Sequence, residues 1–219
     1  MFAEGHTFSR LSALFVNAVS ARVRDGRSTE GDDCIRWAIS DLVKKLRVAK
    51  PRLIEKGSSA RPVVIFTDGA CEGSEVTIGA VLFDDDFGPP EHFGYRVPER
   101  VWNGWKSKAS QLQVIGQAEI APVIIAKLTW ADRIRNRKVI VFIDNEAARI
   151  GLVRSYSPSL PSLKLIGQSI DLDILSSTSC WYARVPTLAN PADLPSRLQP
   201  SEYLKAIGAI GIDPCLPAW

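Results

Sequence analysis

The hydrophobic pattern of the chain changes character near residue 61. Before that point, apolar residues recur at helical spacing, and one stripe predicts a helix with a buried face. The members of this stripe are Ile35, Ala38, Ile39, Leu42, Val43 and Leu46. After that point, short apolar runs alternate with turn residues, which is typical of buried strands. Gly57-Ser58-Ser59, between the two regions, is interpreted as a linker.

Strands and helices then follow in a mixed order. Strands are predicted over 61–67, 75–83, 92–97, 138–143 and 180–185, and helices over 114–134, 145–155, 161–176 and 201–210. Turn residues between the second and third strands indicate a hairpin there. Continuous apolar runs place the first and fourth strands at the centre of the sheet, covered on both sides. The pattern therefore predicts an α/β fold.

Three parts of the chain are expected from this pattern. Residues 1–60 form a helical N-terminal extension, 61–199 an α/β domain, and 200–219 a C-terminal helix and tail. No apolar run approaches the length of a membrane span, so no membrane partner is expected. The four cysteines show no metal-ligand spacing, which indicates reduced thiols and an intracellular location, cytoplasmic or nuclear. A net charge of +3 does not by itself indicate nucleic-acid binding.

Four acidic residues stand where strands end or helices begin. Asp68 and Asp144 each follow an apolar run, and Glu119 and Asp193 stand near the starts of helical patterns. Acids in such places can converge on one point, where they repel each other unless cations neutralise them. Taken singly, each has a structural explanation, such as a turn at Asp68 or a helix cap at Asp144.

The joint pattern resembles the ribonuclease H fold with its four acidic residues. Its details resemble the ribonuclease H domain of retroelement reverse transcriptases, especially the gypsy-like and DIRS-like branches. The segments that carry the resemblance are Phe66-Thr67-Asp68-Gly69-Ala70, Gln117-Ala118-Glu119-Ile120-Ala121-Pro122, Phe142-Ile143-Asp144-Asn145, Arg184-Val185-Pro186 and Asn190-Pro191-Ala192-Asp193-Leu194-Pro195-Ser196-Arg197. The resemblance covers residues 61–198. It implies a mixed five-stranded sheet, with three antiparallel strands and two added in parallel, flanked by helices.

The resemblance also implies an activity. It predicts an endonuclease that hydrolyses the RNA strand of an RNA/DNA hybrid, leaves 5′-phosphate ends, and is associated with a reverse transcriptase polymerase domain. Asp68, Glu119, Asp144 and Asp193 would be its catalytic residues and would hold two Mg²⁺ ions about 4 Å apart, with Mn²⁺ as a substitute. Asp68 would bridge the ions, and Asp193 would help hold the ion that activates water. Glu119 and Asp144 would hold the ion at the departing oxygen.

Residues near these acids are candidates for substrate binding. Cations alternate with indoles just before the predicted helix that carries Glu119, and such a surface suits contacts with the sugars and phosphates of nucleic acid. The candidates are Gly69, Trp102, Trp105, Lys106, Lys108, Asn145 and Arg197. For the residues before Glu119, a solvated loop with one anchoring tryptophan explains the pattern equally well.

A second basic region spans residues 44–56 and holds six cations and one acid, a balance of +5. One interpretation is that it lies along nucleic acid and adds affinity without sequence specificity. The other is that it is the solvated side of the predicted N-terminal helix. Both interpretations stay open at the level of sequence.

Two other functions stay open as well. A nuclease of the same fold that cuts DNA, as resolvases, transposases and integrases do, would use the same carboxylates. A non-catalytic connection module would only grip nucleic acid or a polymerase. Such modules usually lose the acids, whereas all four are present in this chain.

Overall fold

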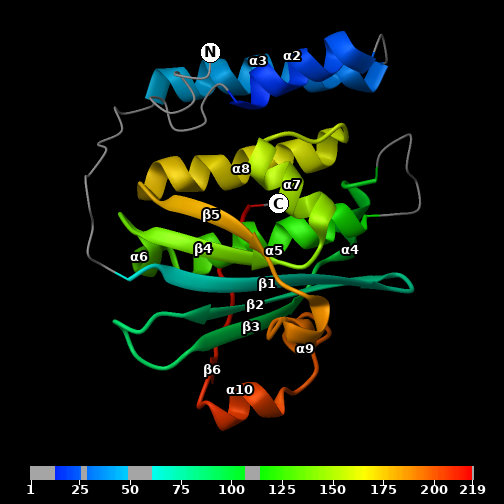
Figure 1. Cartoon of the computed structure of the whole chain (residues 1–219). Helices are drawn as coiled ribbons and strands as arrows, with labels where there is room; N and C mark the ends of the chain where they lie inside the picture. Colours follow the sequence, from blue (N-terminus) through cyan, green and yellow to red (C-terminus); the bar gives the residue numbers. More distant parts are fainter. Residues whose placement is uncertain (1–12, 26–28, 49–60, 107–113, 219) are drawn as a thin grey trace.

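The computed structural model describes residues 13–25, 29–48, 61–106 and 114–218 (Figure 1). The predicted linker at 57–59, Lys108 and residues 49–56 of the basic region lie outside the described residues. Within residues 13–25 and 29–48, two helices precede the sheet, α2 (Ala13–Asp25) and α3 (Thr29–Val48). In the described part of the chain, no helix is both long and apolar enough to cross a membrane.

Six strands of the described chain form one mixed sheet in the order β5-β4-β1-β2-β3-β6. The main strands are β1 (Val63–Glu72), β2 (Glu75–Phe83), β3 (Glu91–Arg96), β4 (Lys138–Ile143) and β5 (Ser179–Arg184). The first three are antiparallel neighbours, whereas β4 runs parallel to β1 and β5 parallel to β4. The predicted mixed sheet, with three antiparallel strands and two added in parallel, is confirmed. A short strand that was not predicted, β6 (Ile210–Gly211), pairs with β3.

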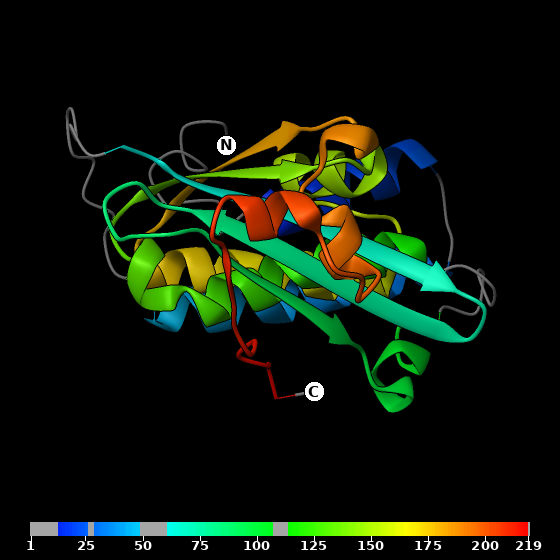
Figure 2. The same cartoon turned by 90° about the horizontal axis from the view of Figure 1, so that it is seen from below.

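Helices cover both faces of the sheet. On one face lie α5 (Ile115–Thr129) and α8 (Leu160–Ser176), with α7 (Glu146–Arg154) beside them (Figure 1). On the other face lie α9 (Asp193–Ser196) and α10 (Glu202–Ala206), which Figure 2 shows from below. Alternate strand residues point to the α5 side, because side chains of a strand alternate between its two faces. They form the main hydrophobic core with α5 and α8.

The N-terminal helices form an outer layer on α8 (Figure 1). Trp37 of α3 packs against Gly167 of α8, where a Cβ would lie only 2.5 Å from the indole ring. The prediction of a buried stripe on α3 is correct at Ala38 but wrong at Ile39, Val43 and Leu46, whose side chains are exposed. The reason is that α2 and α8 contact α3 along one side, and the second half of the stripe faces away from both.

Lys45 occupies part of the buried side of α3 instead. Its side chain is buried, and its Nζ pairs with Asp41 and, at 2.8 Å, with Asp171 of α8. Lys45, although part of the basic region, therefore links α3 to α8 and is not free to bind a phosphate.

Several predicted boundaries also change. The helix expected over 114–134 is divided at Trp130 into α5 and α6 (Ala131–Ile134). The helix expected over 201–210 ends at Ala206, because Gly208 has a φ of +69° and turns the chain towards β6. Two short helices were not predicted, α4 (Glu99–Asn103) and the 3₁₀ helix η1 (Thr187–Ala189).

Candidate metal centre and adjoining groove

Three carboxylates from three elements meet beyond the carboxyl end of β4. β1 and β4 are paired as far as Thr67 and Ile143, and Asp68 and Asp144 are the residues that follow. Glu119 comes from the beginning of α5. One oxygen from each of Asp68, Glu119 and Asp144 lies within 4.8 Å of the other two. The structure thus brings together three of the four acids that were predicted to hold metal.

A glycine and an amide position Glu119 in this group. A Cβ on Gly69 would lie 2.2 Å from the carbonyl oxygen of Ala118, so only glycine lets α5 come this close to β1. The backbone N–H of Gly69 and the side chain of Asn145 both donate to Glu119. Asn145 also caps α7, since its Oδ1 accepts the N–H of Ala148 at 3.0 Å. Contact of Gly69 and Asn145 with substrate stays a prediction.

Burial and mutual repulsion make the charged forms of these acids costly. Asp68 is 4% exposed and Glu119 is 5% exposed. Burial raises the pKa of Asp68 to about 6, helped by Asp144 and Asp193 and opposed by a hydrogen bond from Ser196. Burial, Asp68 and Asp144 raise the pKa of Glu119 to about 9. A bound cation would favour the charged forms and remove this cost.

Two carboxylate oxygens in the group lack a partner. Oε2 of Glu119 and Oδ1 of Asp144 are buried and accept no hydrogen bond. Buried polar atoms are nearly always hydrogen-bonded, so such atoms indicate an ion or another ligand. Carboxylate oxygens are ligands that suit Mg²⁺ or Mn²⁺. The residues present therefore fit a divalent cation, which Asp68, Glu119 and Asp144 would hold.

Asp193, the fourth predicted ligand, lies nearby but outside this group of three. Its charge contributes to the raised pKa of Asp68. Its Oδ1 accepts a hydrogen bond from Nε of Arg197 at 3.2 Å, and Arg197 also pairs with Glu72 at the end of β1. Metal binding by Asp193 and substrate contact by Arg197 stay predictions.

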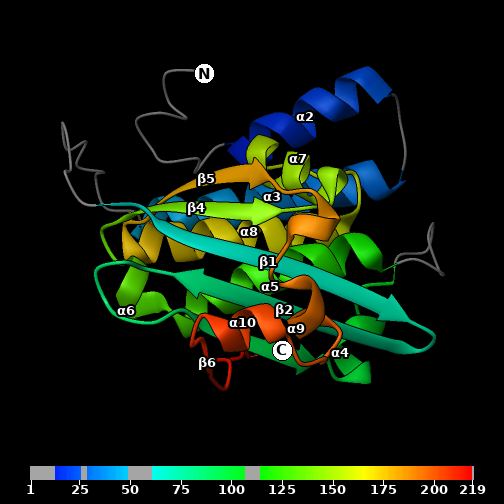
Figure 3. The same cartoon turned by 60° about the horizontal axis from the view of Figure 1, so that its bottom comes forward.

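Two glycines let α9 lie against β2 and β3 of the sheet (Figure 3). Asp68 is paired with Gly79 of β2, and Gly79 with Gly94 of β3, so the three form a row across the sheet. A Cβ on Gly79 would lie 2.3 Å from the nitrogen of Ser196, and one on Gly94 would lie 2.4 Å from the oxygen of Pro195. The absence of these side chains brings Ser196 to Asp68.

Two residues that the sequence did not single out support Asp68. Ser196 is fully buried, and its Oγ donates to Oδ2 of Asp68. Asn190 donates from Nδ2 to the carbonyl oxygen of Thr67 at 3.1 Å, which ties the segment after β5 to β1. Both belong to the segment 190–197, whose spacing carried the resemblance. The spacing of this segment was the feature of the sequence from which Ser196 and Asn190 could have been identified.

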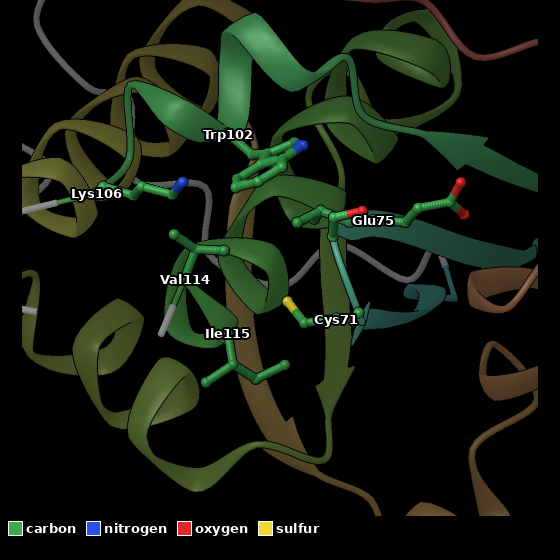
Figure 4. A pocket seen from close by; sticks show the side chains of 9 residues that line it. Cys71, Glu75, Trp102, Lys106, Val114 and Ile115 are labelled. Atoms are coloured by element: carbon green, nitrogen blue, oxygen red, sulfur yellow. The ribbon is translucent and has the colours of Figure 1, made fainter. Parts of the chain in front are cut away.

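A groove of about 360 Å³ lies beside the metal centre, at the end of the β1–β2 hairpin (Figure 4). Trp102 of α4 and Lys106 line one side, and Cys71 and Ile115 line the other. The Nζ of Lys106 lies 4.4 Å from the centroid of the Trp102 ring. Two of the predicted substrate-binding residues, Trp102 and Lys106, therefore border the groove.

Trp105 does not fit its predicted role. Its side chain is 7% exposed and belongs to the main hydrophobic core, because the chain turns inward after α4 at Gly104. Its ring is not available to a substrate. The sequence also allowed a loop with one anchoring tryptophan, and Trp105 is buried as such an anchor would be. Trp102 stays accessible.

Comparisons with solved structures find ribonuclease H domains at low similarity. Ribonuclease H1 of the archaeon Halobacterium salinarum is 20% identical and has a TM-score of 0.44, over 63% of this chain and 96% of its own. LC11-RNase H1, solved in complex with an RNA/DNA hybrid, is 17% identical with a TM-score of 0.44, over 63% and 95%. An N-terminal domain from Mycobacterium tuberculosis is 19% identical with a TM-score of 0.43, over 67% and 96%. No protein-family model and no curated protein matches the chain.

Proposed function

We propose that this protein is a metal-dependent nuclease that hydrolyses the RNA strand of RNA/DNA hybrids. The observation that carries the proposal is the buried group of Asp68, Glu119 and Asp144, in which two oxygens lack a partner. Divalent ions bound there would activate a water molecule and stabilise the departing oxygen of a phosphodiester. The sequence resemblance to retroelement ribonuclease H domains supports the hybrid as substrate and an association with a reverse transcriptase polymerase domain.

The residues of the chain have separate tasks in this proposal. Asp68, Glu119 and Asp144 hold two Mg²⁺ ions, or Mn²⁺ in their place, and Asp193 joins them as the fourth ligand. Ser196 keeps the Asp68 carboxylate in a fixed orientation, because its hydroxyl donates to one of the two oxygens. Arg197 pairs with Oδ1 of Asp193, so Oδ2 is the oxygen with which Asp193 would meet a metal ion.

A cleavage assay tests the proposal directly. The wild-type protein is incubated with an RNA/DNA hybrid, an RNA duplex and a DNA duplex of one sequence, in Mg²⁺, Mn²⁺, Ca²⁺ or a chelator. We expect cleavage of the RNA strand of the hybrid in Mg²⁺ and Mn²⁺, with 5′-phosphate ends. Ca²⁺ should suppress cleavage, because it accepts longer and looser coordination than Mg²⁺. Full activity in the chelator would contradict the metal mechanism.

Other outcomes of the same assay separate the alternatives. Cleavage of the DNA duplex in preference to the hybrid would indicate a nuclease that acts on DNA through the same carboxylates. Binding of the hybrid without cleavage in any metal would indicate a non-catalytic module. A matched control is Asp132→Asn, since Asp132 is an almost fully exposed acid whose loss should leave cleavage unchanged.

A further inference from the structure

We propose that the groove between α4 and the β1–β2 hairpin binds one nucleotide of a substrate strand, with the nucleoside against the Trp102 indole and a phosphate on the Lys106 ammonium group. This inference rests on the proposed nuclease function and adds a binding site outside the metal centre. It involves a helix, α4, that follows β3 and places Trp102 in the groove.

The groove and the metal centre are built on the same two elements: β1 carries Cys71 and Asp68, and α5 carries Ile115 and Glu119. Gly69 donates its N–H to Glu119, and Cys71 lies on the same side of the strand, two residues further on. Two strand residues span roughly 7 Å. When a nucleic-acid strand places one phosphate at the carboxylates, a neighbouring nucleotide of that strand is therefore within reach of the groove.

The lining of the groove suits a nucleotide. Trp102 is half-buried, so part of its ring is accessible, and Val114 and Ile115 provide apolar surface opposite (Figure 4). Every base has a face that can stack on an indole, which gives affinity without sequence preference. The Cys71 side chain is a further, small part of the lining. The walls therefore offer aromatic and neutral contacts to a base and its sugar.

The charges around the groove favour a phosphate at Lys106. Glu75, an acid in the lining, is paired with Arg96, with Nη1 and Oε1 2.8 Å apart. Lys106 is exposed, and within residues 61–106 and 114–218 it forms no ion pair. Its ammonium group lies over Trp102, where it can meet the phosphate of a nucleotide stacked beside it. A volume of about 360 Å³ suits one nucleotide and is too small for a duplex.

Equilibrium binding to a fluorescently labelled hybrid, measured by anisotropy in Ca²⁺ across salt concentrations, tests the proposal. Trp102→Leu should raise Kd about tenfold, because it keeps apolar volume but removes the stacking surface. Lys106→Gln should raise Kd less and reduce the slope of log K against log salt by about one. Cleavage in Mg²⁺ at subsaturating substrate should fall with the affinity in both variants, because less of the hybrid is bound.

Matched controls are Trp181→Leu and Arg135→Gln, an exposed indole on β5 and an exposed cation after α6, which should bind as the wild type does. If both groove variants have the Kd and the salt slope of the wild type, the groove proposal is overturned. If these variants still cleave the hybrid, the proposed nuclease function stands. A wild-type protein that neither binds nor cuts the hybrid would overturn the function and the groove proposal with it. If Trp102→Leu does not fold, Lys106→Gln decides alone, because its side chain is exposed.

Discussion

Helix α5 carries two buried charged residues, and their surroundings differ. Lys127 is 2% exposed, and its Nζ contacts Asp173 at 2.6 Å, Oγ of Ser169 at 2.8 Å and the hydroxyl of Tyr182 at 3.0 Å. Glu119, eight residues earlier, faces two other acids and keeps one oxygen without a partner. The first charge is balanced within the protein, whereas the second lacks a balancing cation among the described residues.

The pKa values follow the same division. Burial alone would lower the pKa of Lys127, but the Asp173 carboxylate outweighs it and raises the pKa above its usual value. The ammonium group therefore stays charged and joins α5 to α8 and β5. Burial and the neighbouring acids raise the pKa of Glu119 to about 9, so its charge is disfavoured until a cation arrives. A buried charge that is balanced by other groups of the protein indicates a structural role. A buried charge without such a partner indicates a binding site for a ligand.

The largest expected effect is on activity, from Asp144→Asn. We expect cleavage of the hybrid to fall below detection, because the change removes a metal ligand while keeping the shape of the side chain. In a chelator the variant should be more stable by about 1 kcal/mol, since one source of repulsion on Asp68 and Glu119 is gone. Urea denaturation and the cleavage assay measure both effects. Retained cleavage would remove Asp144 from the active site, and gross unfolding would make it a structural residue.

Lys127→Met should instead act on stability. Losing one partner of a buried pair leaves Asp173 uncompensated, and we expect the free energy of unfolding to fall by about 3–5 kcal/mol. The double variant Lys127→Met, Asp173→Leu should recover part of this loss, because no buried charge is then left alone. Lys164→Met, at an exposed lysine on α8, is the control and should change stability by no more than about 0.5 kcal/mol. A loss below about 1 kcal/mol in Lys127→Met would show that the pair is not structural.

The pH dependence of stability should differ with and without metal. Asp68 and Glu119 have folded-state pKa values of about 6 and about 9, above the ordinary 3.8 and 4.5. As pH rises past the ordinary values, the unfolded chain loses these protons while the folded protein keeps them, so stability falls. The fall continues to about pH 6 for Asp68 and about pH 9 for Glu119.

Thermal unfolding from pH 5 to 9 in a chelator and in saturating Mg²⁺ checks this. Tm should decrease with pH in the chelator, and Mg²⁺ should remove most of the decrease, because the cation favours the charged carboxylates. A Tm that is flat in the chelator, or that Mg²⁺ leaves unchanged, would contradict the proposed electrostatics of the centre.

The smallest effect is expected from the basic end of α3. Lys45 pairs with Asp171 near the end of α8, which leads to the start of β5, whereas the carboxylates lie beyond the other end of β4 (Figure 1). This separation favours the solvated-face interpretation for Lys44 and Arg47, since exposed charges more than about 10 Å apart are largely screened. Lys44→Gln with Arg47→Gln should leave hybrid affinity and its salt dependence unchanged. A flatter salt dependence would restore the interpretation that these residues bind nucleic acid.

The sequence predicted the features that depend on local pattern. The ranges predicted for the second and fourth strands match β2 and β4, because continuous apolar runs bounded by turns leave little ambiguity. The acids Asp68 and Asp144 were predicted to converge because they follow two such runs. Glu119 was predicted to join them because it stands near the start of a helical pattern, and the resemblance supplied the directions of the strands, which periodicity alone does not give.

Features that depend on contacts between distant segments were missed. The hydrogen bond from Ser196 to Asp68 joins residues 128 positions apart, and nothing local to either residue indicates it. Burial of Lys45 was missed because a lysine in a basic run looks solvated until its partner on α8 is known. Trp102 and Trp105 are close in sequence, yet only tertiary packing decides which one faces the groove.

Calorimetric titration of the metal-free protein with Mn²⁺ tests the central claim most directly, that Asp68, Glu119 and Asp144 form a cation site. Saturable binding is expected in the wild type and in the surface control Asp132→Asn, and not in Asp144→Asn. At neutral pH the binding should release protons, because the raised pKa of Glu119 leaves it protonated in the metal-free protein. Measurements in buffers with different heats of ionisation detect that release. No binding by the wild type, or equal binding by Asp144→Asn, would contradict the account.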